Sequence, residues 1–240
     1  MKHLLYNVAN RMLHPFGAQL YREGIDQASI LGQMARRGVQ VGTVFDIGAS
    51  DGRWSAMAMR HFPHARFLGI DPLIEREPAL QKLKLRNANF DYVLAVAGEE
   101  PNGTVELAVT EDLDGSTVGG GEGAKRKVAA YSLDHLVESR DLPGPFLLKF
   151  DTHGFEVPIM NGAERTLAKT DYIVMECYNY RHTPDTLLFP EMCDLLKTKG
   201  FRCFNLAEPL QRPTDRALWQ MDLFFAREDD AIFASNDYRS

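Results

Sequence analysis

The spacing of apolar positions divides the chain into a helical beginning and a longer region in which strand and helix patterns alternate. Apolar residues recur at helical spacing twice before Gly38, at Leu4, Leu5, Val8 and Met12 and again at Ile25, Ala28, Leu31 and Met34. From residue 41 onward, short apolar runs rich in β-branched residues alternate with helical patterns. We therefore predict a helical appendage or lid over residues 1–40 and one α/β domain over residues 41–240.

The runs that predict strands are residues 43–47, 66–70, 92–96, 104–109, 127–131, 146–150, 172–175, 201–206 and 219–225. Helices are expected over residues 54–61 and from Pro190 to Gly200. The runs 104–109 and 127–131 flank a glycine-rich loop at residues 115–123. The last two runs are expected to pair antiparallel. Acids stand where central strands are expected to end, at Asp71, Asp151 and Glu176.

The turn after the first predicted strand reads D-I-G-A-S-D-G-R-W from Asp46 to Trp54. A dinucleotide fingerprint needs glycine at positions 48, 50 and 53, and Ser50 and Arg53 occupy two of these, so a nicotinamide oxidoreductase is a weak alternative. An acid two residues before Gly48 suits instead a cofactor with an ammonium group and no pyrophosphate. S-adenosylmethionine fits this description.

Asp71 follows Gly48 by 23 residues, a spacing at which a carboxylate can accept hydrogen bonds from ribose hydroxyls. Asp46 lies inside an apolar strand and needs partners, for which we expect the turn N–H groups or the ammonium of a ligand. Purely structural explanations remain open, because Gly48 can serve a tight turn and Ser50 can cap the next helix with Asp51.

Three stretches resemble the FkbM-type methyltransferases, within the class I S-adenosylmethionine-dependent enzymes. They are V-F-D-I-G-A-S-D-G-R-W-S at 44–55, F-L-G-I-D-P at 67–72 and L-L-K-F-D-T-H-G-F-E-V-P-I-M-N-G-A at 147–163. Weaker similarity extends the resemblance to this family over roughly residues 41–227. The resemblance implies a Rossmann-like, doubly wound α/β sheet of seven strands with the last antiparallel and helices on both faces. It also implies S-adenosylmethionine as cofactor and methyl transfer to a hydroxyl oxygen.

The motif positions give the residues expected to bind the cofactor, which are Asp46, Gly48, Ala49, Ser50, Gly52, Trp54, Asp71, Pro72 and Asp151. The acceptor is expected to be a small molecule with a hydroxyl group, either a saccharide or a natural product. Glu176, Tyr178 and His182 are the residues expected to contact it.

An alcohol is a poor nucleophile at neutral pH, so a base that removes its proton should speed transfer by about 10² to 10⁴-fold. His153 is our candidate for this base because it follows the strand predicted over residues 146–150, the fourth of the expected seven-stranded sheet. Histidine also ordinarily titrates near neutrality. In the resembling family this position more often holds an acid or amide. Asp151 is the second catalytic candidate; it can orient the hydroxyl, hold the cofactor ammonium or cap a helix near Phe155. Asp151 and Glu176 are too few ligands to predict a metal site.

Composition limits the alternatives. The 240 residues, with 45% apolar and 25% charged side chains, are typical of a soluble globular protein. A net charge of −6 argues against nucleic-acid binding, and three cysteines without a C-x-x-C pair favour a reducing cytoplasm. No apolar run is long enough to predict a membrane span. A homodimer and a non-catalytic cofactor-binding partner subunit are both compatible with the chain.

Overall fold

The computed structural model describes residues 12, 15, 25–118, 123–181 and 183–238. The first predicted helix, over residues 4–12, lies outside these residues except for Met12. The second is confirmed as α2 (Gln27–Arg36). None of the described helices is long and apolar enough to cross a membrane.

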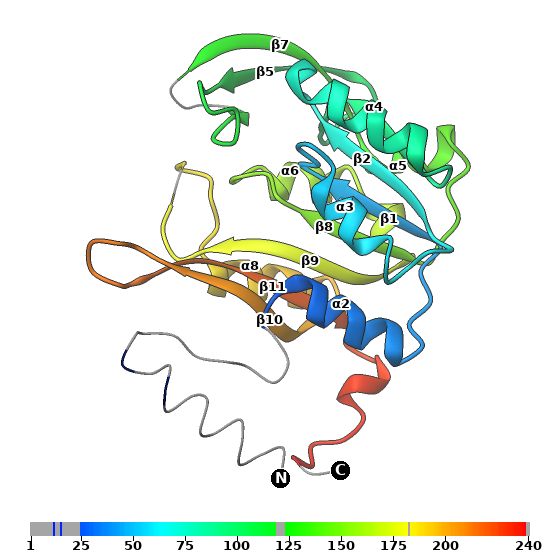
Figure 1. Ribbon diagram of the computed structural model, residues 1–240, viewed down its shortest axis with the longest axis vertical. Helices are drawn as coiled ribbons and strands as arrows, with labels where there is room; N and C mark the ends of the chain where they lie inside the picture. Colours follow the sequence, from blue (N-terminus) through cyan, green and yellow to red (C-terminus); the bar gives the residue numbers. More distant parts are fainter. Residues whose placement is uncertain (1–11, 13–14, 16–24, 119–122, 182, 239–240) are drawn as a thin grey trace.

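Seven strands form the main sheet in the order β10-β11-β9-β8-β1-β2-β3 (Figure 1). Their bounds are β1 Thr43–Ile47, β2 Arg66–Asp71, β3 Phe90–Leu94, β8 Phe146–Phe150, β9 Thr170–Tyr178, β10 Phe201–Gln211 and β11 Leu218–Arg227. Neighbours from β3 to β9 pair in parallel, and β11 is antiparallel to both β9 and β10. The predicted doubly wound sheet with an antiparallel last strand is therefore confirmed.

Helices cover both faces of this sheet. Alternate residues of β1 show the division, since Val44 packs in the core with α2, α3 (Arg53–Ala58) and α4 (Glu77–Arg86). Phe45 and Ile47 point to the other face and pack with α5 (Leu133–Ser139), α6 (Glu156–Asn161), α7 (Glu164–Leu167) and α8 (Phe189–Thr198). Short 3₁₀ turns add η2 (Ile74–Arg76) and η3 (Ala231–Phe233).

A second sheet, which the sequence did not predict as a separate unit, lies between β3 and α5 in the chain. It has the order β4-β7-β5-β6, with β4 Val96–Ala97, β5 Gly103–Val109, β6 Thr117–Val118 and β7 Ala124–Tyr131. The runs 104–109 and 127–131, predicted to flank the glycine-rich loop, correspond to β5 and β7, which pair antiparallel. In Figure 1 this sheet stands above the main sheet, and its turn at residues 110–116 lies on the side to which the parallel strands point.

Several predicted strands have other bounds in the structure, and two of these differences affect the residues near the site. The run 92–96 is divided between the sheets, because β3 ends at Leu94 and β4 pairs with β7. The run 172–175 belongs to a longer strand, β9, which pairs with β11 as far as Tyr178. Glu176 therefore lies inside a strand and not at its end.

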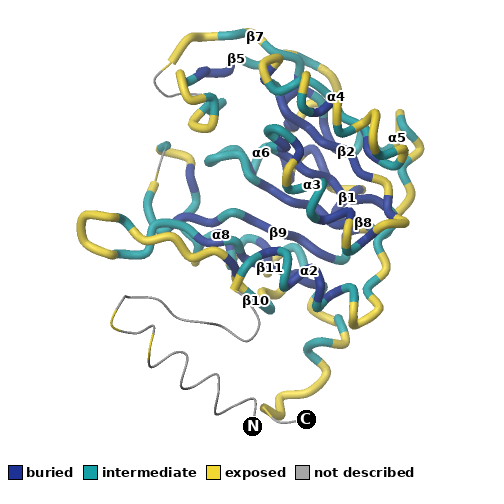
Figure 2. The backbone as a smooth tube through the Cα atoms, viewed as in Figure 1, coloured by how far each residue is buried: buried dark blue, intermediate teal, exposed yellow. Residues whose placement is uncertain are grey.

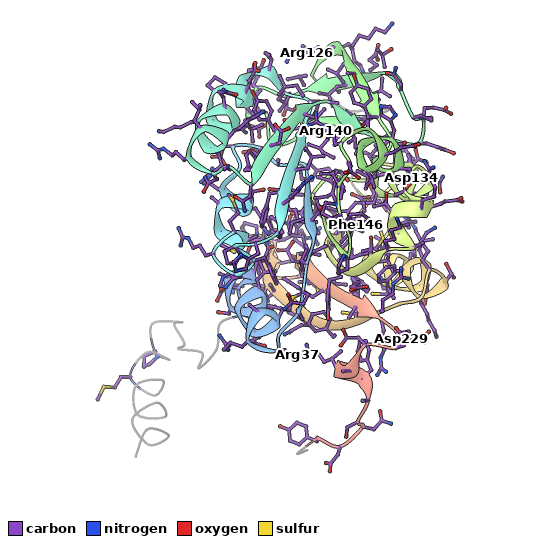
Figure 3. The ribbon with its side chains drawn as sticks, turned by 90° about the vertical axis from the view of Figure 1, so that its right-hand side faces the viewer. Arg37, Arg126, Asp134, Arg140, Phe146 and Asp229 are labelled. Carbon is purple, nitrogen blue, oxygen red and sulfur yellow. The ribbon has the colours of Figure 1, made fainter. Side chains whose placement is uncertain are left out.

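The central strands of the main sheet are buried between two apolar cores, and they are dark blue in Figure 2. Phe146, labelled near the middle of Figure 3, is 1% exposed and meets the ring of Phe45 edge-on with 5.6 Å between ring centroids. Aromatic pairs in this geometry add to the stabilisation that comes from burial.

Phe146→Ala should lower the free energy of unfolding by about 3–5 kcal/mol, because it removes a buried ring and leaves a cavity. Leu85→Ala on α4 is the matched control, since Leu85 is 79% exposed and should change stability by less than about 0.5 kcal/mol. Urea unfolding followed by circular dichroism measures both. Equal stability of the two variants would contradict this account of the core.

Candidate active site

The glycine turn after β1 is shaped by close backbone contacts. Gly48 has φ +80°, and a Cβ placed there would lie 1.9 Å from the carbonyl oxygen of Asp151. Gly52 has φ +78° and begins α3 without a side-chain cap. The expectation that Ser50 caps this helix is therefore wrong, while Asp51 Oδ1 accepts a hydrogen bond from the Arg53 backbone N–H at 3.2 Å. Only glycine fits at position 48.

Asp71, the last residue of β2, holds the far side of this turn. Its Oδ2 accepts a hydrogen bond from the Ser50 backbone N–H at 2.8 Å, and its Oδ1 accepts one from the Leu73 backbone N–H at 2.9 Å. Burial raises the pKa of Asp71 to about 6, although these hydrogen bonds and the charge of Arg76 act in the opposite direction. The carboxylate is thus fixed in place and is costly to keep charged without a ligand.

Asp46 is fully buried in β1 and has partners other than those expected. Its Oδ2 accepts a hydrogen bond from the Ser55 hydroxyl at 2.7 Å, and its Oδ1 lies 3.3 Å from the Lys149 ammonium nitrogen. Burial raises the pKa of Asp46, and Lys149 opposes this. Asp46 does not line the main cavity, and its contacts among the described residues are Ser55 and Lys149 instead of the expected turn N–H groups. A contact with a ligand ammonium stays a prediction.

Lys149, the last residue but one of β8, is the residue that reasoning from sequence missed. Its Nζ lies 2.8 Å from Asp151 Oδ2 and 3.4 Å from the Gly48 carbonyl oxygen, besides its contact with Asp46. Burial opposes its charge, but Asp151 and Asp46 raise the pKa of Lys149. A lysine inside the most apolar strand was the available signal, because such a charge requires buried counter-ions.

Asp151 and His153 follow β8 and connect this ion pair to β9. Although burial opposes it, Lys149 lowers the pKa of Asp151, which stays ionised. Asp151 does not cap α6, whose N-cap is Phe155 without a side-chain hydrogen bond. His153 has φ +52°, a left-handed conformation uncommon outside glycine, and this turns its ring toward β9.

The His153 ring joins the two residues expected to contact the acceptor. Its Nδ1 lies 2.7 Å from the Tyr178 hydroxyl and 3.4 Å from Glu176 Oε2. Tyr178 donates its own proton to Glu176, so Nδ1 is the donor toward Tyr178. Burial alone would lower the pKa of His153. The carboxylates of Glu176 and Asp151 outweigh this effect and raise the pKa to about 9. The imidazole is therefore charged at neutral pH.

Burial, together with the neighbouring charge of Asp151, raises the pKa of Glu176. The ligand atoms of Asp151, His153 and Glu176 lie within 4.8 Å of one another, which is compatible with a metal ion. Each of these residues already has a protein partner, namely Lys149 for Asp151 and Tyr178 for the other two. The cluster is accounted for by these contacts.

A cavity of about 320 Å³ lies between the carboxyl ends of the parallel strands and the second sheet. Of the predicted cofactor and catalytic residues, it is lined by Gly48, Ser50, Asp71, Pro72, Asp151 and His153. The second sheet contributes Leu107, Leu113, Asp114, Ser116 and Val118 to the opposite wall. One cavity thus connects the glycine turn to the candidate base.

The other predicted site residues lie outside this lining. Ala49 is buried in the core, Gly52 packs against α4, and the Trp54 indole donates to the Gln27 side chain on α2. Glu176 and Tyr178 reach the cavity only through His153. His182 lies outside the described residues.

Residues 46–203, more than half of the chain, match the family described as "Methyltransferase FkbM domain". The chain belongs to the FkbM methyltransferase family. The match includes the glycine turn, Asp71 and the Asp151 to Glu176 network, so the cavity is built from the FkbM domain itself. Membership favours methyl transfer over the nicotinamide alternative.

The solved structure of one FkbM methyltransferase has the same fold. Methyltransferase FkbM from Methylobacillus flagellatus is 19% identical with a TM-score of 0.50, over 77% of this chain and 43% of that one. The present chain therefore spans less than half the length of that protein. The 1,6-didemethyltoxoflavin-N1-methyltransferase of Burkholderia thailandensis, solved with S-adenosylhomocysteine, is 15% identical with a TM-score of 0.49, over 87% and 80% of the two chains. Comparison with curated proteins gives no match.

Lys149→Met should lower the free energy of unfolding by about 3–5 kcal/mol at pH 7, because it leaves Asp46 charged and without a counter-ion in the core. The double variant Asp46→Asn/Lys149→Met should recover part of this loss, since no uncompensated charge then remains at position 46. Denaturant unfolding of both variants measures the difference. A single variant as stable as the wild type would refute the role given to Lys149.

Proposed function

We propose that this chain is an S-adenosylmethionine-dependent O-methyltransferase that acts on a hydroxyl group of a saccharide or natural product. The observation that carries this is the single cavity in which Asp71, the Gly48 turn and the Asp151 and His153 pair all take part. The FkbM family membership supports the methyl transfer. A cytoplasmic location, a homodimer and a lid formed by residues 1–40 stay predictions.

The residues present fit this cofactor. The cavity volume of about 320 Å³ lies in the usual range for small-molecule sites. Each Asp71 oxygen accepts one backbone hydrogen bond and keeps acceptor capacity for a ribose hydroxyl. Asp151 would hold the ammonium group, since its carboxylate stays ionised and lines the same cavity. When bound, the cofactor supplies a methyl group on a positively charged sulfur.

The chain must then align the acceptor hydroxyl and accept its proton. Holding two reactants in line inside a dry pocket contributes about 7–11 kcal/mol to catalysis. His153 can accept the proton only in its neutral form, which Glu176 disfavours in the free protein. The positively charged sulfur of a bound cofactor, if it lay beside the ring, would lower the pKa of His153 and favour the neutral imidazole. Glu176 and Tyr178 fix the orientation of the ring.

A non-catalytic cofactor-binding subunit is the second candidate, because a charged His153 is not a base. Binding of cofactor without any transfer would favour this function. Both functions include cofactor binding, and only the enzyme also transfers the methyl group. Binding and transfer therefore need separate measurements.

Wild-type protein should bind S-adenosylhomocysteine in isothermal titration calorimetry, and Asp71→Asn should weaken binding by about tenfold or more, since a charged acceptor is lost. The pKa of Asp71 is raised to about 6, so its carboxyl is ionised above and protonated below that pH. Wild-type affinity should therefore fall as pH drops below about 6, and Asp71→Asn should abolish that dependence. A folded wild-type protein that gives no heat of binding would end the cofactor proposal.

His153→Ala should lower methyl transfer from labelled S-adenosylmethionine to a panel of saccharides by about 10² to 10⁴-fold. The wild-type kcat/KM should rise with pH up to about 9, because the imidazolium of the free protein must lose its proton before it can act as base. His153→Gln, which keeps a polar side chain, is the control for lost contacts. Unchanged turnover, or the same pH profile in the His153→Ala variant, would remove His153 as the base.

A further inference from the structure

Arg76, the last residue of η2, joins the β2 end of the main sheet to the second sheet. Its guanidinium donates to the carboxylate of Asp114, and both residues line the cavity. The Arg76 side chain is only 19% exposed, whereas that of Asp114 is 75% exposed. A mostly buried cation thus stands in the wall of the site.

Most of the donor capacity of this guanidinium is unused. Within the part of the chain that the structure describes, Asp114 is its only acceptor, and the buried Arg76 Nε has no hydrogen-bond partner. A guanidinium presents a planar fork of N–H donors, and a buried donor without an acceptor is unfavourable. A ligand that brings acceptor atoms into the cavity would satisfy these donors.

The position of Arg76 indicates which part of a ligand it meets. Asp71 ends β2 and Asp151 follows β8, and these two strands flank β1 on opposite sides, so the backbones at the two residues lie about 10 Å apart along the edge of the sheet. The Arg76 backbone N–H donates to the Leu73 carbonyl oxygen at 3.0 Å, which fixes Arg76 on the Asp71 side. This is the side proposed for the ribose.

The turn that supplies Asp114 is held in a fixed shape. Leu113 has φ +67°, which is uncommon for a bulky residue, and its side chain lines the cavity. The Ser116 hydroxyl donates to the Leu113 carbonyl oxygen at 2.8 Å, and the Leu113 backbone N–H donates to the Thr110 carbonyl oxygen at 3.1 Å. Backbone strain that is maintained in this way often accompanies ligand contact.

We propose that Arg76 binds the nucleoside half of S-adenosylmethionine, donating hydrogen bonds to acceptor atoms of the adenosine while Asp114 holds the guanidinium in position. This rests on the proposed function. It assigns a binding role to a residue outside the glycine turn and makes the second sheet part of the cofactor site.

Calorimetry with two ligands distinguishes binding of the nucleoside from binding of the amino-acid part. S-adenosylhomocysteine carries the nucleoside and the amino-acid part, and 5′-methylthioadenosine carries the nucleoside without the amino acid. Arg76→Lys keeps the charge beside Asp114 but loses the planar donor fork. It should weaken binding of both ligands by the same factor, about tenfold.

Arg126 on β7 provides a matched control. It forms an ion pair with Glu75, at 2.9 and 2.7 Å, between η2 and the second sheet, and it does not line the cavity. Figure 3 shows Arg126 at the outer edge of the molecule. Arg126→Lys should leave both affinities within about twofold of wild type, as expected for an exposed pair. Thermal unfolding checks that each variant is folded, and Arg76→Gln serves as a second test variant.

Three results would overturn the assignment of Arg76. They are an Arg76→Lys variant that binds both ligands like the wild type, a loss confined to S-adenosylhomocysteine, and an equal loss in Arg126→Lys. The last would mean that Arg76 only tethers the second sheet. Wild-type protein that binds neither ligand would instead refute the proposed function, so the two failures are distinguishable.

Discussion

The buried ammonium of Lys149 is the interaction on which the site depends. Lys149 lies opposite Asp46 in the register of β8 and β1, and it reaches Asp151, the first residue after β8. Charges this deeply buried are tolerated only when they are paired. The pairing fixes the end of β8 against the Gly48 turn, where no side chain fits between Gly48 and the Asp151 carbonyl.

From this ion pair a continuous polar layer runs across the carboxyl ends of the strands. Asp151 lies beside His153, whose ring contacts Tyr178, and Tyr178 donates to Glu176. Glu176 also accepts from Gln220 on β11, so the antiparallel strand takes part in the network. The apolar cores on the two faces of the main sheet pack around these polar groups but offer them no hydrogen-bond partners.

Short, strongly apolar runs with clear ends could be predicted from the sequence, and 43–47 and 146–150 match β1 and β8 residue for residue. The glycine turn and the acids at 71 and 151 were also found, because their spacing reflects local geometry. The partners of β9 and β4 could not be predicted, so the sequence analysis missed that β9 continues past Glu176 along β11 and that residues 96–97 pair with β7 in the second sheet. The contact of Arg76 with Asp114 likewise depends on where the turn at residues 110–116 lies in space, and no local sequence pattern predicts it.

The second sheet is a continuous stretch of chain, from Val96 to Tyr131, inserted between two elements of the main fold. Its strands pair with one another, and it supplies one wall of the cavity while the main sheet supplies the floor. Replacements in this wall therefore need not disturb the strand register that holds Lys149. Apart from Asp114, which pairs with Arg76, the side chains of this segment can change the shape of the cavity wall without touching the partners of Lys149.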